Sequence, residues 1–139
     1  MFKKINLQFV FSYLGLLPFL IILLDNFFFR ILNANIVKDF LIFYSIIIFV
    51  FIGAVNWNLK KNISLIIVFT GFMPSLASVL IIVMFLNSYQ VINYLIILFI
   101  IQLILDNFIY KKRNDRPIFY KLRIPLTIII LVCLILIQL

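Results

Sequence analysis

Five long apolar stretches constrain the fold of this chain more than any other feature of its sequence. They cover residues 7–24, 40–57, 63–86, 91–110 and 122–139. A helix needs about 20 apolar residues to cross the hydrocarbon core of a bilayer. Because lipid offers no partner to a free backbone N–H or C=O group, each stretch is expected to be a helix. The sequence therefore predicts an all-α, polytopic membrane protein, in which residues 1–139 form a single integral membrane domain built as a five-transmembrane-helix bundle.

The composition indicates the same class. Hydrophobic residues make up 67% of the 139 residues and charged residues only 12%, whereas a soluble domain is about half apolar. A soluble chain of this size has too little interior to hide so many apolar side chains. We therefore expect the lipid bilayer to be a main partner of this chain.

The connections between the stretches are short. Residues 25–39 form the longest, and the Phe-Phe-Phe triplet at 27–29 is expected to lie in an interfacial segment at the level of the lipid headgroups. Residues 111–121 are expected to form a basic loop that is broken by Pro117.

The N-terminal sequence has a basic start and an apolar run, which is also the pattern of a signal peptide. No small-x-small cleavage site follows, because the run ends in Leu24-Asp25-Asn26, and the apolar part is long. We interpret it as a retained first helix. The alternative is a four-crossing protein whose first helix is removed or lies on the membrane surface.

The basic residues indicate an orientation. Twelve Lys and Arg residues stand against four Asp and Glu, a balance that can indicate nucleic-acid binding. Here the basic residues lie mostly between the apolar stretches, as the positive-inside rule predicts, so no nucleic-acid partner is expected. With the N-terminus inside, ten of them fall on the inner side: Lys3, Lys4, Lys60, Lys61, Lys111, Lys112, Arg113, Arg116, Lys121 and Arg123.

Only Arg30 and Lys38 then fall on the outer side. This asymmetry predicts a cytoplasmic N-terminus and a periplasmic C-terminus. The high content of Ile, Phe, Asn and Lys is typical of an AT-rich bacterial genome, which favours the bacterial inner (plasma) membrane as the location.

Small residues within the stretches are candidates for close helix packing, which in lipid depends on small side chains. They are Gly15, Gly53, Gly71, Ser75 and Ser78. Pro74 is expected to kink the third span, and Pro18 interrupts the first. Simple helix packing explains these residues. A second interpretation, in which two proline-broken helices line a polar cavity as in some transporters, stays open.

A polar cluster is predicted at the inner end of the bundle. Asp106 lies about one turn inside the fourth span, with Gln102 one turn before it, and Arg123 begins the fifth span on the same side. The predicted cluster consists of Asn56, Trp57, Asp106, Asn107 and Arg123. Ionisable groups inside a membrane are costly and usually pair with one another. Either Asp106 and Arg123 form a structural ion pair, with Trp57 in the aromatic belt, or the cluster binds a ligand or relays a proton.

The usual catalytic patterns are missing from the sequence. It contains no His, a single cysteine at Cys133 and no Gly-rich phosphate loop. These absences remove the commonest routes to acid–base, nucleophilic and metal-assisted catalysis. We therefore expect no enzymatic activity, no cofactor and no metal.

Five segments resemble a known family. They are "YLGLLPF" (13–19), "GAVNW" (53–57), "PSLAS" (74–78), Asp106 and "YKLRIPLT" (120–127). In this order they resemble the domain-of-unknown-function 3429 family, which includes transmembrane protein 69 of mitochondria and many proteobacterial membrane proteins. The chain departs from the family at Asn56, where His or another polar residue is frequent, and at Phe119 and Tyr120, where a Trp is frequent. The resemblance implies a small multi-helix inner-membrane protein and supplies no biochemical activity.

Two functional hypotheses follow. In the first, the chain is a non-enzymatic scaffold or assembly partner of a membrane complex, with a membrane-protein partner or a second copy of itself. In the second, it is a small-solute or proton transporter that uses the polar cluster around Asp106.

Overall fold

The computed structural model describes residues 7–56, 64–88 and 90–138. This part of the chain is helical and contains no strand. Five of its helical segments are long and apolar enough to cross a membrane. The prediction of an all-α bundle with five candidate membrane spans is therefore confirmed.

The first span is built from three pieces and the fifth from three more. The pieces of the first are α1 (Leu7–Leu14), α2 (Leu17–Leu24) and the π-helical turn η1 (Asp25–Phe29). The three central spans are single helices: α3 (Ala34–Val55), α4 (Leu65–Leu86) and α5 (Ile92–Arg113). The fifth consists of α6 (Arg116–Ile118), the π-helical turn η2 (Phe119–Arg123) and α7 (Ile124–Leu136).

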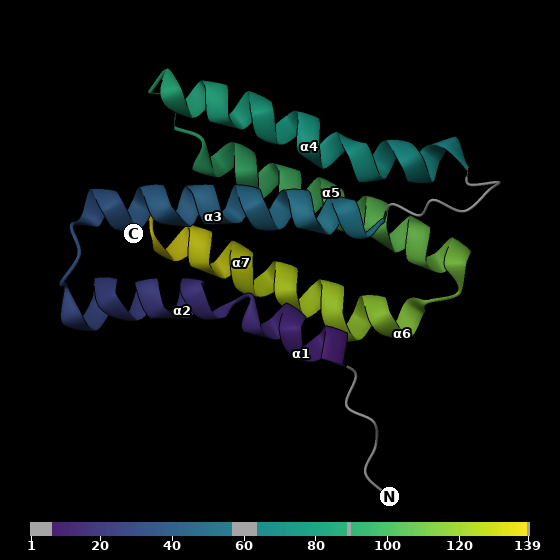
Figure 1. The fold of residues 1–139 in the computed structure, drawn as a ribbon, viewed down its shortest axis with the longest axis horizontal. Helices are drawn as coiled ribbons and strands as arrows, with labels where there is room; N and C mark the ends of the chain where they lie inside the picture. The colour runs from purple at the N-terminus through teal and green to yellow at the C-terminus, as the bar shows by residue number, and fades with distance from the viewer. Residues whose placement is uncertain (1–6, 57–63, 89, 139) are drawn as a thin grey trace, which may run out of the picture.

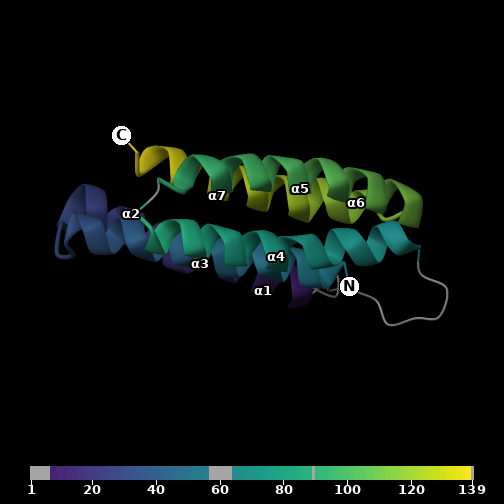
Figure 2. The same cartoon turned by 90° about the horizontal axis from the view of Figure 1, so that it is seen from above.

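The spans lie nearly parallel to one axis and form two layers (Figures 1 and 2). The first span, α3 and α4 lie in one layer, and α5 lies beside α7 in the other. Successive spans run in opposite directions, so the start of α1 and the end of α7 lie at opposite ends of the bundle. The ends of α3 and α5 and the start of the fifth span meet at one end, where the polar cluster was predicted.

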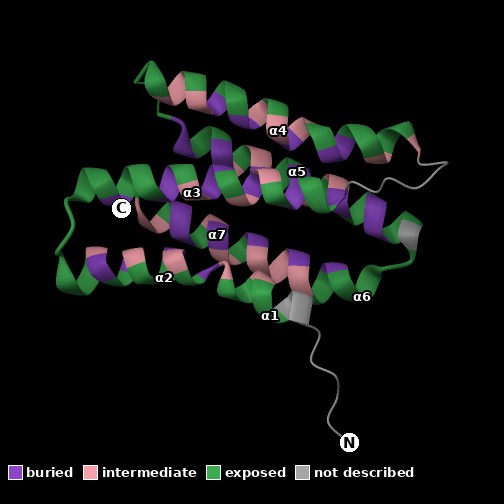
Figure 3. Ribbon diagram, in the orientation of Figure 1, coloured by how far each residue is buried: buried purple, intermediate pink, exposed green. Residues whose placement is uncertain are grey.

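Buried and exposed residues alternate along the helices (Figure 3), and many of the exposed residues are large and apolar, among them Phe28, Ile31 and Leu65. Phe19, Leu41 and Leu95 have no exposed surface, and the rings of Phe49 and Phe99 meet edge to face at 5.2 Å. The outer apolar surface is what a lipid environment requires, because lipid is as apolar as the side chains that face it.

The first connection is much shorter than the sequence predicted. Residues 27–29 belong to η1 and α3 begins at Ala34, so only residues 30–33 lie between the helices. The buried carboxylate of Asp25 accepts hydrogen bonds from the backbone N–H groups of Ile31 (3.2 Å) and Leu32 (3.0 Å). Asn33 then caps α3, because its side chain accepts from the N–H of Asn35 at 2.9 Å.

The last span also begins earlier than predicted. Pro117 lies at the start of α6 and not in a loop, and only residues 114 and 115 separate α5 from α6. Proline suits the first helical turn, since the N–H that it lacks has no partner there. Lys111, Lys112 and Arg116 therefore lie at helix ends with exposed side chains, which can reach water.

The first span joins the bundle through tyrosine hydroxyls that bond backbone carbonyls. The Tyr44 hydroxyl donates to the carbonyl of Gly15 at 2.7 Å, at the break between α1 and α2. The Tyr13 hydroxyl donates to the carbonyl of Lys121 at 2.6 Å. Pro125 has no N–H to offer that carbonyl, so Tyr13 supplies a donor where the helix cannot.

Helices α3 and α4 approach each other closely at Gly53. A Cβ atom at this position would lie 2.6 Å from Cγ of Pro74 and 2.9 Å from the carbonyl oxygen of Gly71. Gly71, Pro74 and Ser78 form the buried face of α4, while Ser75 is half-buried. The Ser78 hydroxyl donates to the carbonyl of Pro74 at 2.7 Å. Small side chains on both helices therefore let the two backbones come together.

Candidate functional site

Helix α5 presents three polar side chains on one face. Gln102, Asp106 and Tyr110 are spaced four residues apart, which places them one above another on a helix. Asp106 lies six residues before Lys112, the last residue of the candidate span, and therefore about 9 Å inside it. The carboxyl group is thus well within the apolar part of the bundle.

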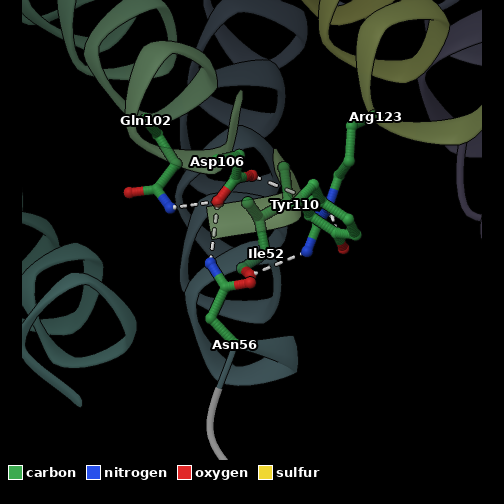
Figure 4. A network of polar contacts seen from close by, with 6 residues as sticks. All are labelled: Ile52, Asn56, Gln102, Asp106, Tyr110 and Arg123. Carbon is green, nitrogen blue, oxygen red and sulfur yellow. Dashed lines mark hydrogen bonds and ion pairs between the residues drawn. The ribbon is translucent and has the colours of Figure 1, made fainter. Parts of the chain in front are cut away.

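Both oxygens of Asp106 are engaged (Figure 4). Oδ1 accepts hydrogen bonds from Nδ2 of Asn56 at 2.7 Å and from Nε2 of Gln102 at 3.0 Å. Oδ2 lies 3.6 Å from Nε of Arg123 and forms an ion pair with it. The carboxylate thus joins α3, α5 and η2.

Arg123 makes further contacts of its own. Its Nε donates to the hydroxyl of Tyr110 at 3.2 Å, and its guanidinium carbon lies 5.8 Å from the centre of the Tyr110 ring. A terminal nitrogen donates to the carbonyl of Ile52 at 3.1 Å. The guanidinium group therefore meets a carboxylate, a phenol and a backbone carbonyl.

The end of α3 makes the Ile52 carbonyl available. The backbone N–H of Asn56 bonds to Gly53 at 2.9 Å in a tight last turn and not to Ile52. A cation at a helix C-terminus is favourable because the last carbonyls carry partial negative charge. Arg123 thus caps α3 as well as pairing with Asp106.

The π-helical turn η2 ends at Arg123. A π-turn places one extra residue in the helical ladder, which changes the direction of the side chains that follow, and such turns are frequent at functional sites. Pro125 lies directly after the turn and cannot donate to the carbonyl of Lys121. The local sequence therefore disfavours a regular α-helix at the point where Arg123 enters the bundle.

The whole cluster is shielded from its surroundings. Asn56 is 0% exposed, Asp106 1% and Arg123 5%, and Gln102 and Tyr110 are buried as well. A charge removed from water is tolerated only where an opposite charge and hydrogen bonds offset the loss of solvation. The contacts around Asp106 and Arg123 supply both.

The structure brings together three of the predicted residues: Asn56, Asp106 and Arg123. Asn107 is exposed, because it follows Asp106 by one residue and points about 100° away around the helix. Trp57 lies outside the described residues. Tyr110 was missed, although its spacing of four residues from Asp106 could have indicated it. Nothing in the sequence marks the Ile52 carbonyl, because any residue carries one.

The chemistry of this cluster is that of charge pairing and hydrogen bonding. The part of the chain that the structure describes contains no group of three or more His, Cys, Asp or Glu side chains that could hold a metal ion. What the cluster offers is one carboxylate and one guanidinium group, each held by neutral donors or acceptors.

Comparison with known proteins gives a family and nothing closer. No curated protein and no solved structure matches the chain. The family model described as "Protein of unknown function (DUF3429)" matches residues 6–139, almost the full length. The earlier resemblance is thereby confirmed, and the chain belongs to the DUF3429 family.

Proposed function

We propose that this protein is a non-enzymatic scaffold or assembly partner of a membrane complex. The observation that supports the proposal is the engagement of Asp106, whose two oxygens receive donors from α3, α5 and η2. A buried ion pair with partners on three elements holds the helices in one arrangement. A rigid bundle with short connections presents a constant outer face to a partner protein or to a second copy.

The alternative is a small-solute or proton transporter that works through Asp106. The observation that favours it is the ionisable carboxyl group of Asp106 inside a candidate span. Ionisable groups in such positions are costly and usually serve a function. A carrier carboxylate must take up and lose a proton in each cycle. Protonation of Asp106 would leave the guanidinium of Arg123 buried without its counter-ion, so the cycle would have to move Arg123 as well.

Proton flux separates the two functions. Purified protein is reconstituted in liposomes, and an imposed membrane potential drives protons while a pH-sensitive dye reports them. If the protein is a scaffold, liposomes that contain the native chain or Asp106→Asn are expected to show the same proton flux as protein-free liposomes. A native flux that Asp106→Asn abolishes, and that the double variant Asp106→Asn/Arg123→Gln does not restore, would support the transporter.

Chemical crosslinking in native membranes tests the assembly role. The native chain and the double variant are expected to enter the same higher-mass complex in equal amounts, since the pair is needed only for folding. Asn107→Ala serves as the control, because Asn107 is exposed. A chain that stays monomeric in the membrane at its native abundance would contradict the proposal.

We also propose the bacterial inner membrane as its location, with the end that carries Asp106 toward the cytoplasm. Lys111, Lys112, Arg116 and Lys121 all lie at that end, and Arg30 and Lys38 lie at the other. The positive-inside rule relates this asymmetry to orientation.

Labelling of single cysteines tests the orientation. In a Cys133→Ser background, Asn35→Cys is expected to react with a membrane-impermeant maleimide in cells whose inner membrane is intact. Lys112→Cys is expected to react only after the membrane is permeabilised. Both positions are exposed, so access from one side or the other decides the result. The opposite labelling pattern would reverse the orientation.

A further inference from the structure

The end of the bundle opposite Asp106 is hollowed by a cavity of about 720 Å³. Its walls come from the start of α3, the turn between α4 and α5, the start of α5 and the end of α7, which meet at one end of the bundle (Figure 1). Sites for small molecules in proteins usually measure about 300–1,000 Å³. The cavity is therefore large enough for a metabolite or for a lipid headgroup.

Polar side chains converge on this cavity above an apolar floor. The polar lining includes two charged side chains and four amides: Asn35, Lys38, Asp39, Gln90, Asn93 and Gln138. The floor includes Ile42 and Ile92, which are buried. Nε2 of Gln138 donates to Oδ1 of Asn93 at 3.0 Å, and this bond joins the end of α7 to the start of α5 across one side of the cavity.

Lys38 and Asp39 carry opposite charges at its edge. They are consecutive residues of α3 and point about 100° apart, so they do not face each other. Among the residues that the structure describes, neither forms a salt bridge. A cation and an anion that line one cavity without pairing offer two separate points of attachment to a ligand that carries both charges.

We propose that this cavity binds a zwitterion through these two residues. Lys38 receives the carboxylate or phosphate of the ligand and Asp39 receives its primary ammonium group. The amide side chains of Asn35, Asn93 and Gln138 hydrogen-bond the remaining polar atoms, and the floor accepts methylene groups. Two sources carry this chemistry: the headgroup of phosphatidylethanolamine and a free α-amino acid.

The position of the cavity suits both sources. Lys38 and Asp39 lie in the second turn of α3, close to the start of its candidate span at Ala34, at the boundary between lipid and water. A headgroup can enter there from the bilayer, and a solute can enter from the water. The site is far from the Asp106 network and its occupancy does not depend on whether the protein is a scaffold or a transporter.

Native mass spectrometry and thermal unfolding test the proposal on the full chain in detergent. The protein is first exchanged out of lipid and then offered phosphatidylethanolamine, phosphatidylglycerol, free phosphoethanolamine or glycine. Preferential retention of phosphatidylethanolamine over phosphatidylglycerol identifies the lipid as the source. A rise in unfolding temperature with glycine alone identifies a free amino acid. Equal retention of both lipids with no rise in unfolding temperature with glycine, or no binding of any of the four, overturns the proposal.

Charge-removing variants assign the site. Lys38→Gln and Asp39→Asn are each expected to weaken binding about tenfold, which corresponds to about 1.4 kcal/mol, while Lys38→Arg keeps the positive charge and most of the affinity. Lys112→Gln and Asp115→Asn are the matched controls, because they remove the same charges from exposed positions at the opposite end. Binding that survives both site variants, or that falls equally in the controls, also overturns the proposal. The site residues are exposed, so the variants are expected to fold.

Discussion

Asp106→Asn is expected to lower the free energy of unfolding by about 3–5 kcal/mol, the usual cost of removing one partner of a buried ion pair. The substitution leaves the guanidinium group of Arg123 enclosed at 5% exposure without its counter-ion. Arginine stays protonated under all ordinary conditions, so it cannot remove the charge by losing a proton. Thermal unfolding in detergent and the amount of protein in membranes measure the loss.

Arg123→Gln is expected to cost less than Asp106→Asn. The carboxyl group that remains can take up a proton and become neutral, and its Oδ1 still accepts from Asn56 and Gln102. The double variant has no charge left in the polar cluster, and its stability is expected to exceed that of Asp106→Asn alone. Asn107→Ala provides the control at the next residue, which is exposed. A double variant whose losses are simply additive would show that the two side chains are not coupled.

Gly53→Ala is expected to lower the free energy of unfolding by about 1–3 kcal/mol, the range found when a packed interior is overfilled. The added methyl group would meet the Gly71 carbonyl oxygen at 2.9 Å and Cγ of Pro74 at 2.6 Å. The first of these atoms is backbone and cannot move unless α4 moves with it. The same end of α3 also holds Asn56 and the Ile52 carbonyl, so a shift there would loosen the polar cluster.

Two further variants make this test specific. Ala54→Leu adds more volume at the neighbouring residue, which is exposed, and is expected to change stability little. Pro74→Ala removes the closest of the clashing atoms, so Gly53→Ala is expected to cost less in that background than in the native chain. Equal losses for Gly53→Ala and Ala54→Leu in thermal unfolding would contradict the close packing of α3 and α4.

The sequence determined the class of fold, because this class depends only on the length and composition of the apolar runs. A run of about 20 apolar residues has few options besides a membrane-spanning helix, so five such runs predict five spans. The ends of the helices were harder to predict from the sequence. Arg30 adopts a left-handed conformation and Asp25 bonds the backbone beyond it, and this local arrangement turned a predicted loop of fifteen residues, 25–39, into four, 30–33.

The pairing of Asp106 with Arg123 could also be predicted from the sequence. Two opposite charges inside adjacent antiparallel spans usually pair, because an unpaired charge inside a membrane is costly. Only the tertiary structure decided what surrounds the pair. The Ile52 carbonyl became available through a tightened helix end, and Arg123 reached it from a π-helical turn. The cavity at Lys38 and Asp39 likewise depends on four elements meeting at one end. Apolar runs are a local property of the chain, whereas the direction of a side chain depends on contacts between residues far apart in it.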